Sequence, residues 1–600
     1  MATAFQSVVP KIVPFRVPQP VKSLLERALG IEEIERVYQT LQTMNEGRSI
    51  VDRLLDFLAV TYTASEIDLA RVPRSGPAIV TANHPFGILD GAVLASLLAQ
   101  VRPDVRFLAN GILTVVPEIC EMVIAVDPTG GRGAAAANGR GLRKALQHLR
   151  SGGMLVIFPA GEVSHFRWKD RAVTDAEWNP MAARMAEIAR VPVIPAYVEG
   201  SNSRVFQVAG IAHPGFRTAL LGRELLNKRG RHVEVRIGTQ IPPDKLQAMP
   251  AARQRADYLR WRTYLLAIRQ RFKPRTALPG PMGGQRVAGK QAEPVAAPLA
   301  SGPIAREIAA LPVSGLLGRS GELEVYVAPA SDIPNALYEL GRLREIAFRA
   351  AGEGTGKPRD LDEFDPHYLH LFVWNARKRE LVGAYRLART DAVCKQFGAG
   401  GLYTAALFGY GAPFLDRLGP ALELGRSFVR QEYQKSFGPL LLLWKGIGAF
   451  VARNPQYKIL FGPVSISNQY QAVSRELMVS FLEKFALLQD WSGLARNRQA
   501  FDGRLLKGAH RPAFPATGFD IEDLSAVVSE MEQTPAGVPV LLRQYLRLGG
   551  KLLGFNVDPN FANALDGLIL VDLTKTEPKL LERYLGTREA ATFLEFQKGN

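Results

Sequence analysis

The sequence contains little that would crosslink it, bind a metal or cross a membrane. Among 600 residues there are only two cysteines, Cys120 and Cys394. Two cysteines give neither a disulfide framework nor a metal cluster, so we expect both to be reduced core residues. No apolar run approaches the roughly 20 residues that a membrane-spanning helix needs. The N-terminus also lacks the charged-then-apolar pattern of a signal peptide. These absences predict a cytoplasmic protein without a metal site.

Signatures of nucleic-acid-binding proteins are also absent, although the charge is strongly positive. The formal net charge is +17 and the pI is near 9.8, a balance for which nucleic acid is the usual partner. The positive charge is spread along the chain, and no helix-turn-helix, zinc-finger or RNP-type pattern accompanies it. We therefore expect no nucleic-acid partner, and instead an anionic membrane surface or an acidic protein. Residues 21–29 are amphipathic and would either lie in a membrane interface or pack on their own domain.

The chain is too long for a single core, and its composition changes near the middle. Residues 273–286 and 291–303 are dominated by Pro, Gly, Ala and Ser and lack hydrophobic periodicity, which is typical of a linker. No repeat relates the two halves. We therefore expect two different domains, at residues 1–272 and 321–600, joined by a flexible linker at residues 273–320.

The first half carries a histidine and a carboxylate at a predicted turn. His84 follows an apolar run at residues 78–82, and Asp90 stands at the start of the next apolar segment. The pattern predicts a strand, a turn and the start of a helix. In that geometry Asp90 can orient the imidazole of His84, which then takes a proton from a hydroxyl. The alternative is that Asp90 only caps the helix and that His84 only stabilises the turn.

Two further predicted strands end in recognisable motifs. The apolar run at residues 154–158 leads into Phe158-Pro-Ala-Gly-Glu-Val-Ser164, and residues 191–198 form another strand with proline at its edge. Weaker strands are predicted at residues 105–109 and 232–237, with helical periodicity between the strands. Strands that alternate with helices predict an α/β domain, whose strand ends carry the ligand-binding loops.

With these three motifs in order, residues 70–240 resemble the glycerolipid acyltransferase family, which is lysophosphatidic acid acyltransferase-like. The resemblance implies that His84 and Asp90 are catalytic, although five residues separate them here and the family usually has four. It also implies an acceptor site that includes Asn83, Gly161, Glu162 and Ser164. The family's phosphate-binding arginines are missing, because residues 122–128 and 161–164 contain no Arg.

A phosphate site needs fixed cationic donors, so the missing arginines bear on the acceptor. We expect its hydroxyl group to belong to a molecule other than a glycerol phosphate. Glu162 favours an acceptor with a cationic or hydroxyl group, and a surface ion pair is an equally good interpretation of this residue.

The second half is also predicted to alternate strands and helices. The predicted elements are strands at residues 323–328, 369–373, 380–387 and 459–465, and helices at residues 333–350 and 439–450. The tail predicts a helix at residues 538–550 and strands at residues 554–561 and 565–572, with Asp558 and Asp566 interpreted as turn residues. A strand followed by a glycine loop and a helix N-terminus can hold a pantetheine arm or a pyrophosphate.

Residues 323–480 resemble the GNAT-fold N-acyltransferases, most of all the branch that contains ornithine N-acyltransferases and acyl-homoserine-lactone synthases. The resemblance is carried by residues 343–348, 362–365, 382–386, 423–427 and 460–465. It implies a catalytic Glu423 and a substrate-binding set made of Glu363, Asp365, Arg426 and Ser427.

The chemistry of amine acylation suits these residue types. An α-amine is mostly protonated at neutral pH and cannot attack a thioester in that form. Glu423 or Asp365 can accept its proton, and Arg426 can hold the carboxylate of an amino acid. The alternative is that Glu423 and Arg426, three residues apart, only pair with each other.

Together the two halves resemble the bifunctional ornithine lipid synthases. The resemblance implies that the C-terminal domain N-acylates an amino acid with a 3-hydroxyacyl chain from acyl carrier protein. The N-terminal domain would then esterify the new hydroxyl at the inner face of the membrane. Acyl carrier protein is acidic, which suits a basic enzyme, and no further cofactor is expected. Ornithine is the implied amino acid, glycine, glutamine and lysine stay open, and a hemolysin-like membrane-binding protein without catalysis is the alternative from another class.

Overall fold

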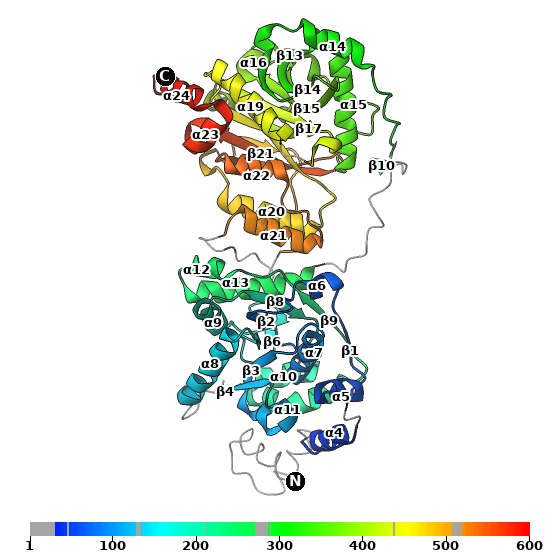
Figure 1. Ribbon diagram of the computed structural model, residues 1–600, viewed down its shortest axis with the longest axis vertical. Coiled ribbons are helices and arrows are strands. Elements are labelled where there is room, and N and C mark those ends of the chain that lie inside the picture. Colours follow the sequence, from blue (N-terminus) through cyan, green and yellow to red (C-terminus); the bar gives the residue numbers. More distant parts are fainter. Residues whose placement is uncertain are drawn as a thin grey trace. The chain divides into compact units, whose positions relative to one another are not determined.

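The fold is α/β, as expected, and comprises two sheet-based units (Figure 1). The computed structural model describes residues 31–44, 47–127, 134–212, 214–269, 286–287, 290–435, 438–491, 493–506, 514 and 519–599. Contacts group residues 1–271 with 504–535 as unit 1, and residues 272–503 with 536–600 as unit 2. The amphipathic segment predicted at residues 21–29 lies outside the described residues, as does most of the predicted linker before residue 286.

A seven-stranded sheet in the order β1-β9-β8-β2-β5-β3-β4 forms the centre of unit 1. Its strands are β1 (Thr61–Thr63), β2 (Ala78–Ala82), β3 (Val105–Asn110), β4 (Val123–Val126), β5 (Met154–Ile157), β8 (Val193–Val198) and β9 (His232–Ile237). β8, β2, β5, β3 and β4 run parallel, so their carboxyl ends lie at one edge. Every residue of β2 and β5 is buried, as expected for central parallel strands that are covered on both faces.

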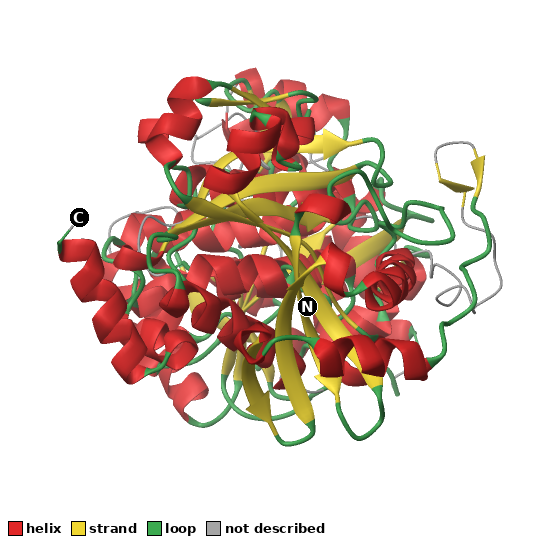
Figure 2. Cartoon of the chain, turned by 90° about the horizontal axis from the view of Figure 1, so that it is seen from above, coloured by secondary structure: helices red, strands yellow, loops and turns green. Residues whose placement is uncertain are grey.

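Helices flank this sheet, and a short hairpin lies beside it. They are α4 (Ile31–Thr43), α5 (Ile50–Phe57), α6 (Glu66–Ala70), α7 (Ile88–Ala99), α8 (Ala134–Arg150), α9 (Met181–Ala189), α10 (Arg204–Ala212), α11 (Pro214–Leu226), α12 (Pro243–Gln247) and α13 (Ala252–Leu265), with the hairpin β6 (His165–Arg167) and β7 (Ala172–Thr174). Figure 2 colours helices red and strands yellow. α7 follows β2 and is apolar on almost every side, so it is buried in the core. Its first turn carries Asp90.

Unit 2 is built on an eight-stranded sheet in the order β12-β13-β14-β15-β17-β18-β21-β20. Its strands are β12 (Leu316–Ser320), β13 (Leu323–Pro329), β14 (Leu369–Asn375), β15 (Glu380–Arg389), β17 (Ala421–Val429), β18 (Ile459–Ile466), β20 (Lys551–Asp558) and β21 (Ala564–Asp572). The main helices are α14 (Ser301–Ala310), α15 (Pro334–Ala350), α19 (Gly438–Arg453), α20 (Ala472–Phe485), α22 (Val540–Arg547), α23 (Pro578–Leu585) and α24 (Thr587–Lys598).

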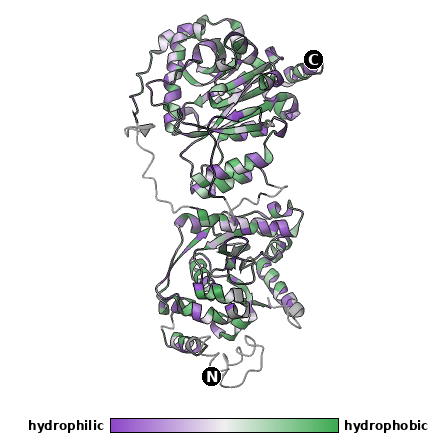
Figure 3. Cartoon of the chain, turned by 180° about the vertical axis from the view of Figure 1, so that it is seen from behind, coloured by the Kyte–Doolittle hydropathy of each residue, from purple (hydrophilic) through white to green (hydrophobic). Residues whose placement is uncertain are grey.

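Successive residues of β14 show how this sheet is covered on both faces. A Cβ atom on Gly446 of α19 would lie 3.3 Å from Leu371, so α19 packs closely on one face. Phe372, the next residue along the strand, belongs with Leu340 of α15 to the apolar cluster on the other face. Neighbouring side chains of a strand point to opposite faces. Figure 3 shows the hydrophobic colouring along the strands of both sheets.

The parallel strands β17 and β18 pair over only three residues each. Residues 421–423 pair with residues 459–461, after which both strands continue unpaired with each other. β18 goes on pairing with β21 instead. β17 is irregular here, because Arg426 has a φ of 47° and the register with β15 shifts. The two strands therefore separate beyond Glu423, and the candidate site of unit 2 lies around this separation.

Two segments differ from the sequence expectation about domains. α14 and β12 lie inside the predicted linker, and Ile304 and Ile308 of α14 are buried in the cluster that α15 completes. Because prolines and alanines dominate this segment, the sequence analysis did not recognise Ile304 and Ile308 as an apolar pair at helical spacing. α21 (Ile521–Glu532) lies inside the predicted C-terminal domain, yet its contacts group it with unit 1. Hydrophobic periodicity identifies an apolar helix face without identifying the partner that covers it.

The prediction that both cysteines are core residues was wrong. Cys120 is exposed, and Cys394 is only partly buried. Within the described ranges, no helix has the length and apolar character that crossing a bilayer requires. The same ranges hold no group of three or more His, Cys, Asp or Glu side chains arranged to bind a metal ion.

Candidate active sites

The turn after β2 brings the predicted histidine and aspartate of unit 1 together. Nδ1 of His84 lies 2.9 Å from Oδ2 of Asp90. The same carboxylate oxygen accepts the backbone N–H groups of Phe86 and Gly87, each at 2.9 Å. Asp90 therefore binds the backbone at the start of α7 and at the same time lies beside the imidazole of His84. Gly87 is one of the five intervening residues, and its φ of 95° is one that other residues rarely adopt.

The environment of this pair leaves one ring nitrogen available. Asp90 is fully buried, and burial raises its pKa against the hydrogen bonds from His84 and the two backbone groups. The side chain of His84 is 19% exposed, and its ring stacks on Phe158 at a centroid distance of 4.1 Å. With Nδ1 beside the carboxylate of Asp90, Nε2 is the ring nitrogen left to accept a proton. No side chain in the described part of the protein forms a hydrogen bond with it.

The turn after β5 is tied to the His84 turn through Ser164. The backbone N–H of Ser164 donates to the carbonyl of His84 at 2.8 Å. Its buried hydroxyl donates to Oδ1 of Asp175 at 2.5 Å. The N–H of Gly161 donates to the carbonyl of Phe158 at 3.0 Å and closes a tight turn. Ser164 therefore joins the turn after β5 to the turn after β2 that carries His84.

Asp175 is a site residue that the sequence analysis missed. Its Oδ1 also accepts the backbone N–H of His84 at 3.2 Å, and its Oδ2 accepts Nε1–H of Trp178 at 2.8 Å. Asp175 is fully buried. It lies 91 residues from His84 in the sequence, outside any recognisable motif, so no local signal pointed to it.

Asn83 and Glu162 have partners within unit 1. Nδ2 of Asn83 donates to the carbonyl of Val198 at 2.9 Å, and Oδ1 accepts the N–H of the same residue at 2.7 Å. The Asn83 amide thus joins the ends of β2 and β8. Glu162 accepts a hydrogen bond from Nη2 of Arg217 on α11 at 2.6 Å, which is the ion pair considered for it above.

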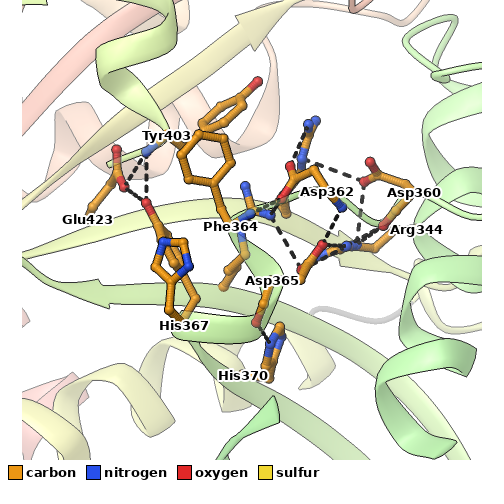
Figure 4. Close-up of polar contacts among 12 residues, drawn as sticks. Arg344, Asp360, Asp362, Phe364, Asp365, His367, His370, Tyr403 and Glu423 are labelled. Carbon is orange, nitrogen blue, oxygen red and sulfur yellow. Dashed lines mark hydrogen bonds and ion pairs between the residues drawn. The ribbon is translucent and has the colours of Figure 1, made fainter. Parts of the chain in front are cut away.

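In unit 2, three aspartates and three arginines form a network of hydrogen bonds and ion pairs near β17 (Figure 4). They are Asp360, Asp362, Asp365, Arg344, Arg386 and Arg426. Asp365 accepts three hydrogen bonds from Arg344, each at 3.0 Å, and lies 3.4 Å from Arg386. Burial alone would raise the pKa of Asp365, but these guanidinium groups hold that pKa well below its ordinary value. Arg386 also donates to Asp362 at 2.5 Å. Of the predicted residues Glu363 and Asp365, only Asp365 is in this network; Glu363 is exposed, and its neighbour Asp362 contacts Arg386.

Arg426 completes the network from β17. Its guanidinium lies 3.4 Å from Asp362 and 3.6 Å from Asp360, and it covers the rings of Tyr403 and Phe561 at 4.8 and 4.9 Å from their centroids. Ser427 follows it on β17 and is half-buried. The charge of Arg426 is therefore already balanced by two carboxylates.

Glu423 has partners other than Arg426. Its carboxylate accepts the backbone N–H groups of Tyr403 at 3.1 Å and Thr404 at 2.6 Å, and it accepts a short hydrogen bond from the hydroxyl of Tyr368. It is 1% exposed. The alternative interpretation, in which Glu423 and Arg426 only pair with each other, is not supported, because this pair is not among the ion pairs of the described residues. Glu423 holds the segment around Tyr403 in place, beside the point where β17 leaves β18.

Three further carboxylates lie around Arg426, and none was recognised from sequence as a site residue. Glu353 accepts a hydrogen bond from Ser465 at 2.8 Å, and Asp558 accepts one from Tyr403 at 3.4 Å. Asp566 lies inside β21, directly across from Ser465. The interpretation of Asp566 as a turn residue was wrong, because it is buried within β21, whereas Asp558 ends β20 and its Oδ1 accepts the N–H of Asn560 in the following turn at 2.9 Å.

Comparisons with known proteins agree with this division. Residues 11–270 match the family described as Acyltransferase, and residues 343–444 match the Acetyltransferase (GNAT) domain. A glycine N(alpha)-acyltransferase of Phocaeicola vulgatus is 35% identical over 251 residues, which are 40% of this chain and 76% of that protein. An L-ornithine N(alpha)-acyltransferase of Rhodobacter capsulatus is 29% identical over 40% of this chain and 88% of its own length. A lyso-glycine lipid O-acyltransferase of Bacteroides thetaiotaomicron is 23% identical over 42% of this chain and 91% of its own length.

The two sheets, their sites and these matches define an acyltransferase with two catalytic domains of different fold. The chain belongs to the family of GNAT-type N-acyltransferases that includes the glycine N(alpha)-acyltransferase of Phocaeicola vulgatus.

Proposed function

We propose that this protein makes a diacylated amino acid lipid by two successive acyl transfers. Unit 2 transfers a 3-hydroxyacyl chain to the α-amine of an amino acid, and unit 1 esterifies the 3-hydroxyl group of the product. The observation that carries the proposal is the imidazole of His84, held through Nδ1 by Asp90 with Nε2 left open, in the same chain as an N-acyltransferase domain.

The O-acylation step follows from that geometry. Nε2 of His84 takes the proton of the acceptor hydroxyl as its oxygen attacks the thioester carbonyl. The carbon–sulfur bond then breaks, and the thiolate leaves with the proton that the imidazolium returns. Asp90 stabilises the imidazolium that exists between the two proton transfers.

The acceptor of this step is proposed to carry no phosphate. Arg217 lies beside the turn after β5, and its charge is balanced by Glu162 at 2.6 Å. A phosphate needs cationic donors that are not already neutralised. An N-acylated amino acid offers a hydroxyl group without this requirement.

In the N-acylation step, the α-ammonium must first lose its proton. Glu423 is our candidate to accept it, directly or through water, next to the place where β17 and β18 separate. The neutral amine then attacks the thioester carbonyl, and the thiol of the carrier leaves. We propose acyl carrier protein as the donor, because an acidic carrier is attracted to a chain with a net charge of +17. We place the reaction at the inner face of the cell membrane, where the product would belong.

Two amino acids are supported by different observations. Ornithine is favoured by the sequence resemblance and by the relative from Rhodobacter capsulatus, and glycine is favoured by the more similar relative from Phocaeicola vulgatus. The overall chemistry is the same for both.

Lipid analysis of a bacterial host without aminolipids tests the proposal. Expression of the wild-type chain should yield a diacylated, phosphorus-free aminolipid. His84→Ala should accumulate the monoacyl amide, and Glu423→Ala should abolish both products. Because Glu423 holds backbone groups, its variant needs a folding control, which is O-acylation of monoacyl amide supplied from outside. Accumulation of lysophosphatidate in place of an aminolipid would overturn the proposal.

A further inference from the structure

The six carboxylates around Arg426 outnumber the guanidinium groups. Arg344, Arg386 and Arg426 are matched one for one by Asp360, Asp362 and Asp365. Glu353, Asp558 and Asp566 come in addition. Among the side chains that the structure describes, no Lys or Arg nitrogen lies within ion-pair distance of these three. The site of unit 2 therefore has an excess of buried carboxyl groups over guanidinium groups.

Asp566 is the most unusual member of this group. It is 4% exposed, and its side chain forms neither a hydrogen bond nor an ion pair with any described residue. Its position is well defined, because β21 sets it directly opposite Ser465 of β18, and side chains that face each other across a ladder lie on the same face. The hydroxyl of Ser465 donates to Glu353, so Asp566 points into the same group of carboxylates. A buried carboxylate without a partner is costly, and such groups cluster at ligand sites.

The electrostatic environment of these carboxyl groups favours a cationic ligand. Burial and the charges of Asp558 and Glu353 raise the pKa of Asp566 well above its ordinary value, and burial raises the pKa of Glu353 to about 7. Arg426 faces both, but its nearest carboxylates are Asp362 and Asp360. A cationic ligand would favour the ionised form of these buried carboxyl groups and offset the repulsion of Asp566 by Asp558 and Glu353.

The reacting α-amine is a poor candidate for that cation. A cluster of carboxylates holds an ammonium group in its protonated form, and a protonated amine cannot attack a thioester. A second ammonium group, which stays charged throughout the reaction, has no such conflict. Glycine and glutamine lack one, whereas ornithine and lysine carry one on their side chains.

We propose that Asp566, Asp558 and Glu353 form a subsite for the side-chain ammonium group of a diamino acid acceptor. This inference rests on the proposed function and selects ornithine or lysine over glycine or glutamine. The subsite lies between the ends of β20 and β21 and the turn after α15, next to Arg426.

Acceptor competition with the purified full-length protein tests it. With a 3-hydroxyacyl thioester of acyl carrier protein as donor, kcat/KM is measured for ornithine, lysine, glutamine and glycine. We expect ornithine or lysine to exceed both others at least tenfold. Asp566→Asn should raise KM for the preferred diamino acid about tenfold or more and leave glycine and glutamine unchanged or improved. Asp416→Asn, at an exposed position on α18 (Ala412–Leu418), is the matched control and should behave as wild type.

The outcomes separate this inference from the proposed function. Equal turnover of glycine and ornithine, or an equal loss for every acceptor in Asp566→Asn, would overturn the subsite and leave amino acid acylation standing. Failure to acylate any of the four amino acids would overturn the proposed function itself. Asn is nearly the same size as Asp and removes a repelled charge, so this variant is expected to fold.

Discussion

Nδ1 of His84 and Oδ2 of Asp90 lie 2.9 Å apart, although five residues separate them in the sequence. Within this loop Gly87 has a φ of 95° and donates its own N–H to the same carboxylate oxygen at 2.9 Å. One buried oxygen thus caps a helix, closes a loop and fixes an imidazole. This sharing makes the loop sensitive to substitutions that leave the imidazole itself unchanged.

We expect Asp90→Asn to reduce O-acylation about 100-fold or more, with N-acylation unaffected. The amide carries no charge to stabilise an imidazolium, and a general base contributes about this much to rate. The measurement is acyl transfer to supplied monoacyl amide by the purified protein. Asp244→Asn, an exposed position on α12, is the control. A fully active Asp90→Asn protein would contradict the proposed role.

Gly87→Ala should be more destabilising than Gly76→Ala. Both glycines have positive φ, 95° and 84°, so either alanine costs about 1–2 kcal/mol of backbone strain. At Gly87 the new Cβ would also lie 3.2 Å from Leu221, whereas at Gly76 nothing is within 4 Å. The comparison of urea unfolding midpoints therefore separates backbone strain from the contact. Equal midpoints for the two variants would show that Leu221 moves aside without a measurable loss of stability.

Asp175→Asn should lower kcat for O-acylation, with a smaller change in KM. The carboxylate accepts from His84 and Ser164 on one oxygen and from Trp178 on the other, so an amide must turn its NH₂ group toward a donor. In the double variant with Trp178→Phe, that conflict is removed and part of kcat should return. A double variant no better than Asp175→Asn alone would argue against this positioning role.

Glu530→Gln should weaken the attachment of α21 to the rest of unit 1. Oε2 of Glu530 lies 2.8 Å from Nη2 of buried Arg262 and accepts the N–H of Thr239 at 2.7 Å. Loss of one partner of a buried ion pair costs about 3–5 kcal/mol. The measurement is the free energy of unfolding of unit 1, with exposed Glu121→Gln as the control.

The effect of Glu530 should also depend on pH in a defined direction. Burial alone would raise the pKa of Glu530, but the charges of Arg262 and Arg71 lower that pKa below its ordinary value. A carboxylate with a lowered pKa stabilises the fold above its ordinary pKa and loses that contribution as the pH falls through the lowered value. The difference between wild type and Glu530→Gln should therefore shrink toward acid pH. A constant difference would contradict the assignment.

Glu353 should give the opposite pH dependence. Burial raises its pKa from 4.5 to about 7, so the native state keeps a proton that the unfolded chain releases. The stability that this proton provides is present below about pH 4.5 and is lost as the pH rises to about 7. Relative to wild type, Glu353→Gln should gain stability across this window, by roughly 3 kcal/mol at most. Parallel unfolding curves against pH for the two proteins would contradict the raised pKa.

Periodic and local features were predictable from the sequence. The strand expected at residues 78–82 is β2 itself, and the helix expected at residues 333–350 is α15 almost unchanged. The motif that contains His84 and Asp90 was also found, because its parts lie within seven consecutive residues. Asp175 and Asp566 were missed for the converse reason, since their partners come from distant strands and turns.

The sequence by itself determined the two α/β folds, the strand ends that carry the candidate sites, and the residues of the histidine–aspartate pair. Those features depend on hydrophobic period and short-range turn chemistry, which any stretch of chain carries within itself. Only the tertiary structure decided that α21 joins unit 1, that Glu423 holds backbone groups, and that three extra carboxylates surround Arg426. Burial and charge balance depend on which side chains from distant parts of the sequence come into contact, and the spacing of residues in the sequence does not show those contacts.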